Sequence, residues 1–200
     1  MSKEIGVGMR KILWISAMLF FAPNFSMAND EPSLLMEGGL ESLIAFRDSF
    51  TIEYSDQVSD GCLPQPSRMK DKMELAIRQN GFSISTESFF SNKIKITALG
   101  FATNSSSCAI SLQAELEFWA SVLVPFAQTV PKGNNTIAPI IYDFGSVILT
   151  GNKNGMQKRV ENQIKEFGDD LYLNISRAKD YISKKFPEMP KYHEQQKSEK

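Results

Sequence analysis

The chain has 200 residues, a formal net charge of −1 at pH 7, two cysteines and one histidine. The nearly balanced charge excludes a strongly basic surface, and with it nucleic acid as the main partner. The length suits a single domain with its own hydrophobic core.

The first 28 residues have the three parts of a secretory signal peptide. A basic start precedes the apolar run of residues 12–22, and the small residues Ser26–Ala28 follow it. We therefore predict cleavage between Ala28 and Asn29, which would carry the chain into the periplasm of a bacterium or out of the cell. An uncleaved membrane anchor is the alternative, but the run is shorter than the roughly 20 residues of a membrane-crossing helix. No later stretch is as apolar over such a length, so we expect no stable membrane insertion after cleavage.

Residues 40–55 predict a first strand or a bent pair of strands. Phe50, Ile52 and Tyr54 alternate with polar residues, which is the period of a half-buried strand. The earlier half of this segment is also compatible with a helical turn.

Cys62 follows in a turn-like stretch rich in Gly, Pro and Ser, and Cys108 opens a later strand. Apolar residues in that strand recur at every second position from Cys108 to Phe118, so Cys108 lies at the edge of a buried face. Two cysteines of an exported chain usually pair, because disulfides persist in oxidising compartments. We predict a Cys62–Cys108 disulfide that pins the loop before the first helix to the sheet. The alternative is a reactive thiol, which needs a neighbouring base or cation, and no histidine is near either cysteine in the sequence.

Residues 68–79 predict a helix, with Ser67 as its N-cap and Gly81 at the left-handed position after its end. Short turns and one polar loop separate the segments that come next, as in an antiparallel meander. Phe82, Ile84 and Thr86 alternate with polar residues in 82–88, and alternation then predicts strands at residues 93–103, 108–118 and 140–151.

Apolar residues from Met156 to Ile182 recur at spacings of three and four, which predicts one long helix with an apolar stripe. Asn154 is placed to cap its start, and Gly168 is the point at which the helix could kink or break. We expect the stripe to pack on the sheet, because half-buried strands need a covering layer. A coiled coil with a partner is the alternative. Residues 184–200 contain two prolines and many charges, and we expect them to form a disordered polar tail.

These elements predict an α+β fold in residues 29–183, forming a single domain. One layer is an antiparallel sheet of about four to five strands, and the other is a long C-terminal helix with a shorter helix beside it. The order of the elements is β-α-β-β-β-α.

The sequence offers no motif for a catalytic centre, a metal site or a cofactor. Its one histidine, His193, lies in the predicted tail, where a disordered segment cannot hold a catalytic geometry. Clusters of Cys and His with zinc spacing and glycine-rich phosphate loops are both missing from the sequence. Glu115 and Glu117 share one face of a strand, roughly 7 Å apart, and leave a carboxylate-based glycan hydrolase as an alternative.

Aromatic residues on the outer strand faces are the better lead to a binding site. Strand parity places Trp119 on the face opposite Phe118, and Leu99 and Phe101 on the face opposite Ile94. Exposed apolar patches mark partner sites, and tryptophan is a frequent hot-spot residue. We predict a partner-binding patch that contains Trp119, Phe101 and Leu99. Burial of Trp119 in the core is the alternative.

We therefore expect an exported, non-enzymatic envelope protein that binds a protein partner or an envelope ligand in an accessory or inhibitory role. A glycan hydrolase of the envelope and a secreted effector are the alternatives. Three glycosylation sequons leave a eukaryotic secreted origin open, and they begin at Asn104, Asn134 and Asn174.

Overall fold

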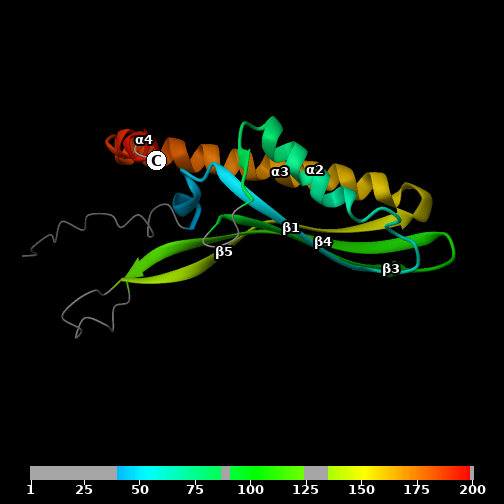
Figure 1. Cartoon of the computed structure of the whole chain (residues 1–200). Helices are drawn as coiled ribbons and strands as arrows, with labels where there is room; N and C mark the ends of the chain where they lie inside the picture. Colours follow the sequence, from blue (N-terminus) through cyan, green and yellow to red (C-terminus); the bar gives the residue numbers. More distant parts are fainter. Residues whose placement is uncertain (1–39, 87–90, 124–134, 199–200) are drawn as a thin grey trace, which may run out of the picture. The chain divides into compact units, whose positions relative to one another are not determined.

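The computed structural model describes residues 40–86, 91–123 and 135–198. The predicted signal peptide and its cleavage site lie outside these residues. The described part is α+β, with a five-stranded sheet, three α-helices and a short 3-10 helix. In chain order (Figure 1), the elements are η1 (Leu40–Ile44), β1 (Ser49–Val58), α2 (Arg68–Gln79), β2 (Ser83–Ile84), β3 (Lys93–Ala102), β4 (Ser107–Leu123), β5 (Asn135–Asn152), α3 (Lys153–Lys185) and α4 (Met189–Ser198).

The sheet is mixed, with the strand order β2-β1-β3-β4-β5. The antiparallel meander is confirmed for β3, β4 and β5. The prediction of a wholly antiparallel sheet is wrong for β1, which runs parallel to both β2 and β3. The chain leaves the end of β1 through α2 and returns to the other end of the sheet, and such a crossover makes the next strands parallel.

The earlier half of the predicted first strand segment forms η1 instead. Its residues Leu43, Ile44, Ala45 and Phe46 are apolar without alternation, and a short apolar run does not distinguish strand from helix. Ile44 and Ala45 are buried in the core. The backbone N–H of Arg47 donates to the Ile44 carbonyl and closes the turn before β1 begins.

The helices α2 and α3 cover one face of the sheet (Figure 1). The predicted stripe of α3 is buried there from Met156 to Ile182, so it forms core. The strands contribute the other half of this core through the side chains that point toward the helices. The fully buried members on the strands are Phe50, Ile94, Ile96, Ala98, Ile110, Leu112, Ala114, Leu116 and Phe118.

The long helix α3 is continuous through Gly168, where the sequence suggested a kink. A Cβ atom at Gly168 would lie 2.7 Å from the Cβ of Ala76 on α2. At Gly168 the two helices lie too close together for a side chain. The glycine therefore allows α3 to pack against α2.

The helix ends differ from the predicted caps in two details. Asn152 is the N-cap of α3, and its side-chain oxygen accepts a hydrogen bond from the backbone N–H of Asn154. Ser67 occupies the N-cap position of α2 but makes no side-chain capping hydrogen bond. Gly81 has a φ of +84°, as expected for the left-handed residue that ends α2.

The predicted disordered tail is helical over much of its length. Pro187 follows directly after the C-cap Phe186, where proline prevents the continuation of α3. Helix α4 then begins at Met189, and Pro190 lies in its first turn, where a missing N–H costs nothing.

Cys62 and Cys108 are joined by a disulfide, as the sequence predicts, with a Cα–Cα distance of 5.9 Å. Both residues are buried. The bond fixes the loop between β1 and α2 to the beginning of β4.

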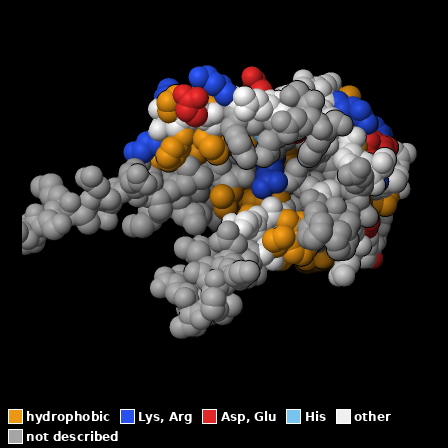
Figure 2. Space-filling view, turned by 60° about the vertical axis from the view of Figure 1, so that its left-hand side comes forward, with side chains coloured by type: hydrophobic (Ala, Val, Ile, Leu, Met, Phe, Trp, Pro, Cys, Tyr) orange, Lys and Arg blue, Asp and Glu red, His pale blue; other side chains and the backbone are white. Residues whose placement is uncertain are grey.

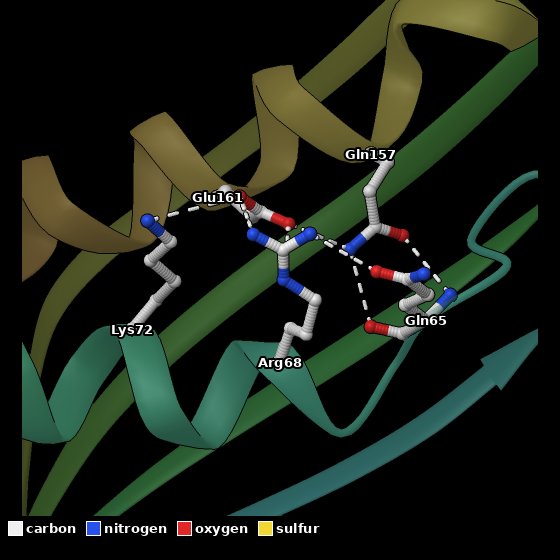
Figure 3. A network of polar contacts seen from close by, with 5 residues as sticks. All are labelled: Gln65, Arg68, Lys72, Gln157 and Glu161. Atoms are coloured by element: carbon white, nitrogen blue, oxygen red, sulfur yellow. Dashed lines mark hydrogen bonds and ion pairs between the residues drawn. The ribbon is translucent and has the colours of Figure 1, made fainter.

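A polar network joins α2 to α3 beside the core (Figure 3). Its centre is Glu161 of α3, which is only 8% exposed. The Glu161 carboxylate accepts hydrogen bonds from Arg68 at 3.2 Å and from Gln157 at 2.9 Å, and it lies 3.8 Å from the Lys72 ammonium group. The network satisfies a carboxylate that would otherwise be costly to bury.

Removing the disulfide should lower the free energy of unfolding by about 4 kcal/mol, because the unfolded chain regains the freedom of a 46-residue loop. Urea unfolding of the oxidised protein, the reduced protein and the Cys62→Ser/Cys108→Ser variant would measure this loss. A loss below about 1 kcal/mol would show that the cross-link does not constrain the unfolded chain.

Gly168→Ala should destabilise the protein, although alanine is the better helix former by about 1 kcal/mol. The new Cβ would force α2 and α3 apart at Ala76. Gly155→Ala is the matched control, since Gly155 lies in the same helix with nothing within 4 Å of its Cβ position. The control should gain up to about 1 kcal/mol in urea unfolding. A gain in both variants would disprove the close contact.

Candidate functional site

No described helix covers the second face of the sheet (Figure 1). We call this surface the open face; it is formed by the outward side chains of β1, β3, β4 and β5. Strand register arranges these side chains in rows across the sheet. The rows differ in chemistry, with apolar groups toward both ends and a charged band between them.

The first apolar group lies where β3 ends and β4 begins. Leu99, Phe101 and Ile148 are 47%, 59% and 72% exposed. The β4 residues between them are small: Ser111 pairs with both Leu99 and Ile148, and Ala109 pairs with Phe101. Large side chains around small ones leave a shallow cavity of about 340 Å³ that all five residues line. We call these five residues the Phe101 patch.

Trp119 is not part of the Phe101 patch, although the sequence analysis grouped it with Leu99 and Phe101. Trp119 pairs with Pro139 and lies ten residues beyond Ala109 on β4, which is about 34 Å along a strand. Its exposure is intermediate, and its backbone carbonyl accepts a 3.4 Å hydrogen bond from Arg47. The exposed Ile137 and Ile141 lie on β5 on either side of Pro139. The structure thus divides the predicted patch between two ends of the open face.

The band between the two ends is held by ion pairs across the strands. Lys95 pairs with Glu117, and Lys93 lies 2.9 Å from Glu53. The hydrogen bond with the Glu117 carboxylate raises the pKa of Lys95. Glu115 accepts a 2.8 Å hydrogen bond from Gln113. Each glutamate of the candidate acid pair is therefore engaged by a neighbour, Glu117 across the strands and Glu115 along its own strand.

Sequence reasoning missed Arg47, which connects η1 to the far end of the sheet. Its guanidinium carbon lies 4.8 Å from the centre of the Phe118 ring, and it donates hydrogen bonds to the carbonyls of Leu43 and Trp119 and to the Asn92 side chain. Burial lowers the pKa of Arg47. A charged pair, Arg47 and Asp48, that follows an apolar run was the available signal in the sequence. Its role is to hold η1 against β3 and β4.

Other exposed apolar side chains lie near the helices. Figure 2 shows hydrophobic side chains in separate groups on the side that it displays, with basic side chains between them. A cavity of about 310 Å³ lies among residues 45–48 after η1, α3 and α4, and its lining includes Phe46 and His193, whose ring centres are 5.0 Å apart. His193 is thus a packing residue of α4 in this structure. Within the described ranges, no group of acids, histidines or cysteines could hold a metal ion.

Comparison with known proteins gives structural similarity of low strength only. No protein-family model matches the chain, and no curated protein matches it. Among solved structures, the chain is similar to a minor lipoprotein from Acinetobacter baumannii, with 10% sequence identity and a TM-score of 0.33. The similarity covers 66% of this chain and 92% of that protein. At this identity and TM-score, it does not indicate a function.

The cellular compartment is indicated by the cysteines. A buried disulfide is typical of proteins in oxidising compartments outside the cytoplasm, where such bonds persist. Of the helices that the structure describes, none is long and apolar enough to cross a membrane.

Phe101→Ser should change the free energy of unfolding by less than about 0.5 kcal/mol, because the side chain is mostly exposed. Phe118→Ala, which truncates a fully buried ring on β4, should cost about 3–5 kcal/mol. Urea unfolding of both variants would test this contrast. A large cost for Phe101→Ser would mean that its ring is buried in the folded protein, and the Phe101 patch would then be core.

Proposed function

We propose that this chain is an exported, non-enzymatic protein of the bacterial envelope that binds a protein partner at the Phe101 patch. The observation that carries the proposal is the exposure of three large apolar side chains around one hollow. Contiguous exposed apolar groups mark protein interfaces, and pockets of this kind receive the anchoring side chain of a partner.

The surroundings of the patch support a preformed surface. Cys108 pairs with Ala102 at the end of β3 and β4, directly beside Ala109 and Phe101. The disulfide therefore holds the strands at the same end as the hollow. A surface that is rigid before binding loses less conformational freedom when the partner docks.

The disulfide and the predicted signal peptide support export, and the periplasm is the compartment we propose. The acid pair gives weaker support to a glycan hydrolase, because Glu117 is engaged by Lys95 on an open sheet surface. Retaining and inverting glycosidases need two carboxylates that flank a bound sugar.

A photo-crosslinking amino acid in place of Phe101 should capture a discrete protein in intact cells, whereas the same group at Leu75 should not. Leu75 is the matched control, because it is an equally apolar residue that is 49% exposed on α2. The Leu99→Ser/Ile148→Ser background should abolish the adduct at position 101 while the protein remains folded by circular dichroism. Adducts at both positions, or none at either, would contradict a partner site at the Phe101 patch.

Fractionation of the same cells tests the compartment. The mature chain should appear in the periplasmic fraction with an amino terminus near Asn29. A full-length chain in the cytoplasm would contradict export, whatever the crosslinking result.

A further inference from the structure

The first strand, β1, has a free edge within the described part of the structure. It pairs with β3 from Thr51 to Val58, but with β2 only at Ser49 and Phe50. Strand β2 is two residues long and leaves the rest of that side without a neighbouring strand among the described residues. This edge is distinct from the Phe101 patch, which lies over β3, β4 and β5.

The hydrogen bonds of β1 identify which backbone groups face the free edge. The Phe50 carbonyl accepts from the Ser85 N–H on the β2 side, and the Thr51 N–H donates to the Asn92 carbonyl on the β3 side. Backbone groups of successive residues alternate between the two sides of a parallel strand. The N–H and C=O groups of the even-numbered residues therefore point to the free edge: Ile52, Tyr54, Asp56 and Val58.

A recess lies over β1 and the strand paired with it, β3. A cavity of about 400 Å³ is lined by four consecutive residues of β1, Ile52–Ser55, together with Lys70 of α2 and residues 95–97 of β3. Because β3 is the neighbour on the paired side of β1, this cavity lies over the β1–β3 pair and not along the free edge. Lys70 on α2 borders the recess from the helical side.

One polar group in this recess has no partner. The hydroxyl oxygen of Tyr54 is buried and makes no hydrogen bond with any described residue. Buried tyrosine hydroxyls usually find a hydrogen-bond partner. Burial, and then the nearby Asp56 carboxylate, raise the pKa of Tyr54, so the group remains a neutral donor.

The charges beside the edge set the character of an added strand. Asp56 forms no ion pair with the residues that the structure describes, and it is exposed. A second copy that paired antiparallel through this edge, with its two-fold axis at Asp56, would place two Asp56 carboxylates directly opposite each other, which is unfavourable. A basic residue opposite Asp56 is favourable instead.

We propose that the free edge of β1, from Ile52 to Val58, binds an extended segment of a partner protein as an added strand, with a basic residue beside Asp56. The bound segment lies beside β1 in line with β2, and extends the pairing that β2 begins at Ser49 and Phe50. It supplies partners for the edge-facing backbone groups, in the manner of known strand-addition complexes, and an acceptor for the Tyr54 hydroxyl.

Hydrogen exchange of the full mature chain tests whether the edge is open. In the free protein, the amides of Ile52, Tyr54, Asp56 and Val58 should exchange fast, while those of the intervening residues should be protected by β3. Protection of the edge amides at every protein concentration would mean that the chain covers its own edge, and would overturn the proposal. Protection that grows with concentration would identify a second copy as the occupant, and would also overturn it.

A defined peptide then tests strand addition. The probe is a nine-residue peptide in which valine and threonine alternate around a central lysine, and the control peptide carries two prolines in the same frame. Only the first should bind and slow exchange at the edge amides. Equal binding of both peptides, or binding of the first without protection of these amides, would overturn the proposal.

Variants at Asp56 separate backbone pairing from charge. Asp56→Pro removes one edge-facing N–H, a position where a strand tolerates proline, and should weaken binding of the probe by about tenfold or more. Asp56→Asn keeps that N–H and should weaken binding by only about threefold. Tyr54→Phe removes the hydroxyl alone and should also weaken binding. Unfolding in urea would check that each variant is folded, and unchanged binding by a folded Asp56→Pro protein would overturn the proposal.

A last variant keeps this proposal apart from the proposed function. Phe101→Ser should leave the affinity for the probe peptide unchanged, because the Phe101 patch lies on another part of the sheet. Loss of probe binding in Phe101→Ser would place the peptide on the open face and would overturn strand addition at β1.

Discussion

One-sided burial of the sheet is the constraint on which the other features depend. The helices α2 and α3 cover a single face, so every strand residue that points toward them must be apolar. The inward residues of β4 are accordingly buried without exception from Cys108 to Phe118. The outward residues carry no such requirement, and they alone vary from charged to polar to apolar along the strands.

The sequence predicts those parts of the fold in which one-sided burial produces a regular spacing of apolar residues. The alternation in β4 and the three-four spacing in α3 each identify an element and its buried face. The direction of β1 leaves no such trace, because a strand has the same period whether its neighbour is parallel or antiparallel. Likewise, η1 is a short unpatterned apolar run, and Glu161 is a charged residue whose burial depends on partners from another helix.

In the candidate site, too, the features set by local periodicity were predictable and those that depend on distant residues were not. Parity along one strand correctly assigned Leu99 and Phe101 to the outward face, because that assignment needs only local counting. The contribution of Ile148 depends on the register between β4 and β5, and the distance to Trp119 depends on the length of β4, which is 17 residues. Contacts of that kind join residues far apart in the chain, and a single sequence does not contain them.

The same chain path explains both the rigid and the open ends of the sheet. At one end, the Cys62–Cys108 bond ties the exit from β1 to the start of β4, so the strands near Phe101 are cross-linked as well as paired. On the other side of β1, the two residues of β2 are the only strand residues that pair with it in the described part of the chain. A longer β2 would have satisfied the backbone of β1, and its shortness leaves an edge that would invite self-association. The exposed carboxylate of Asp56 opposes pairing between identical edges, which is how natural sheets protect an open strand. The same charge does not oppose a basic segment, so in our proposal Asp56 disfavours pairing in that register and favours a basic partner strand.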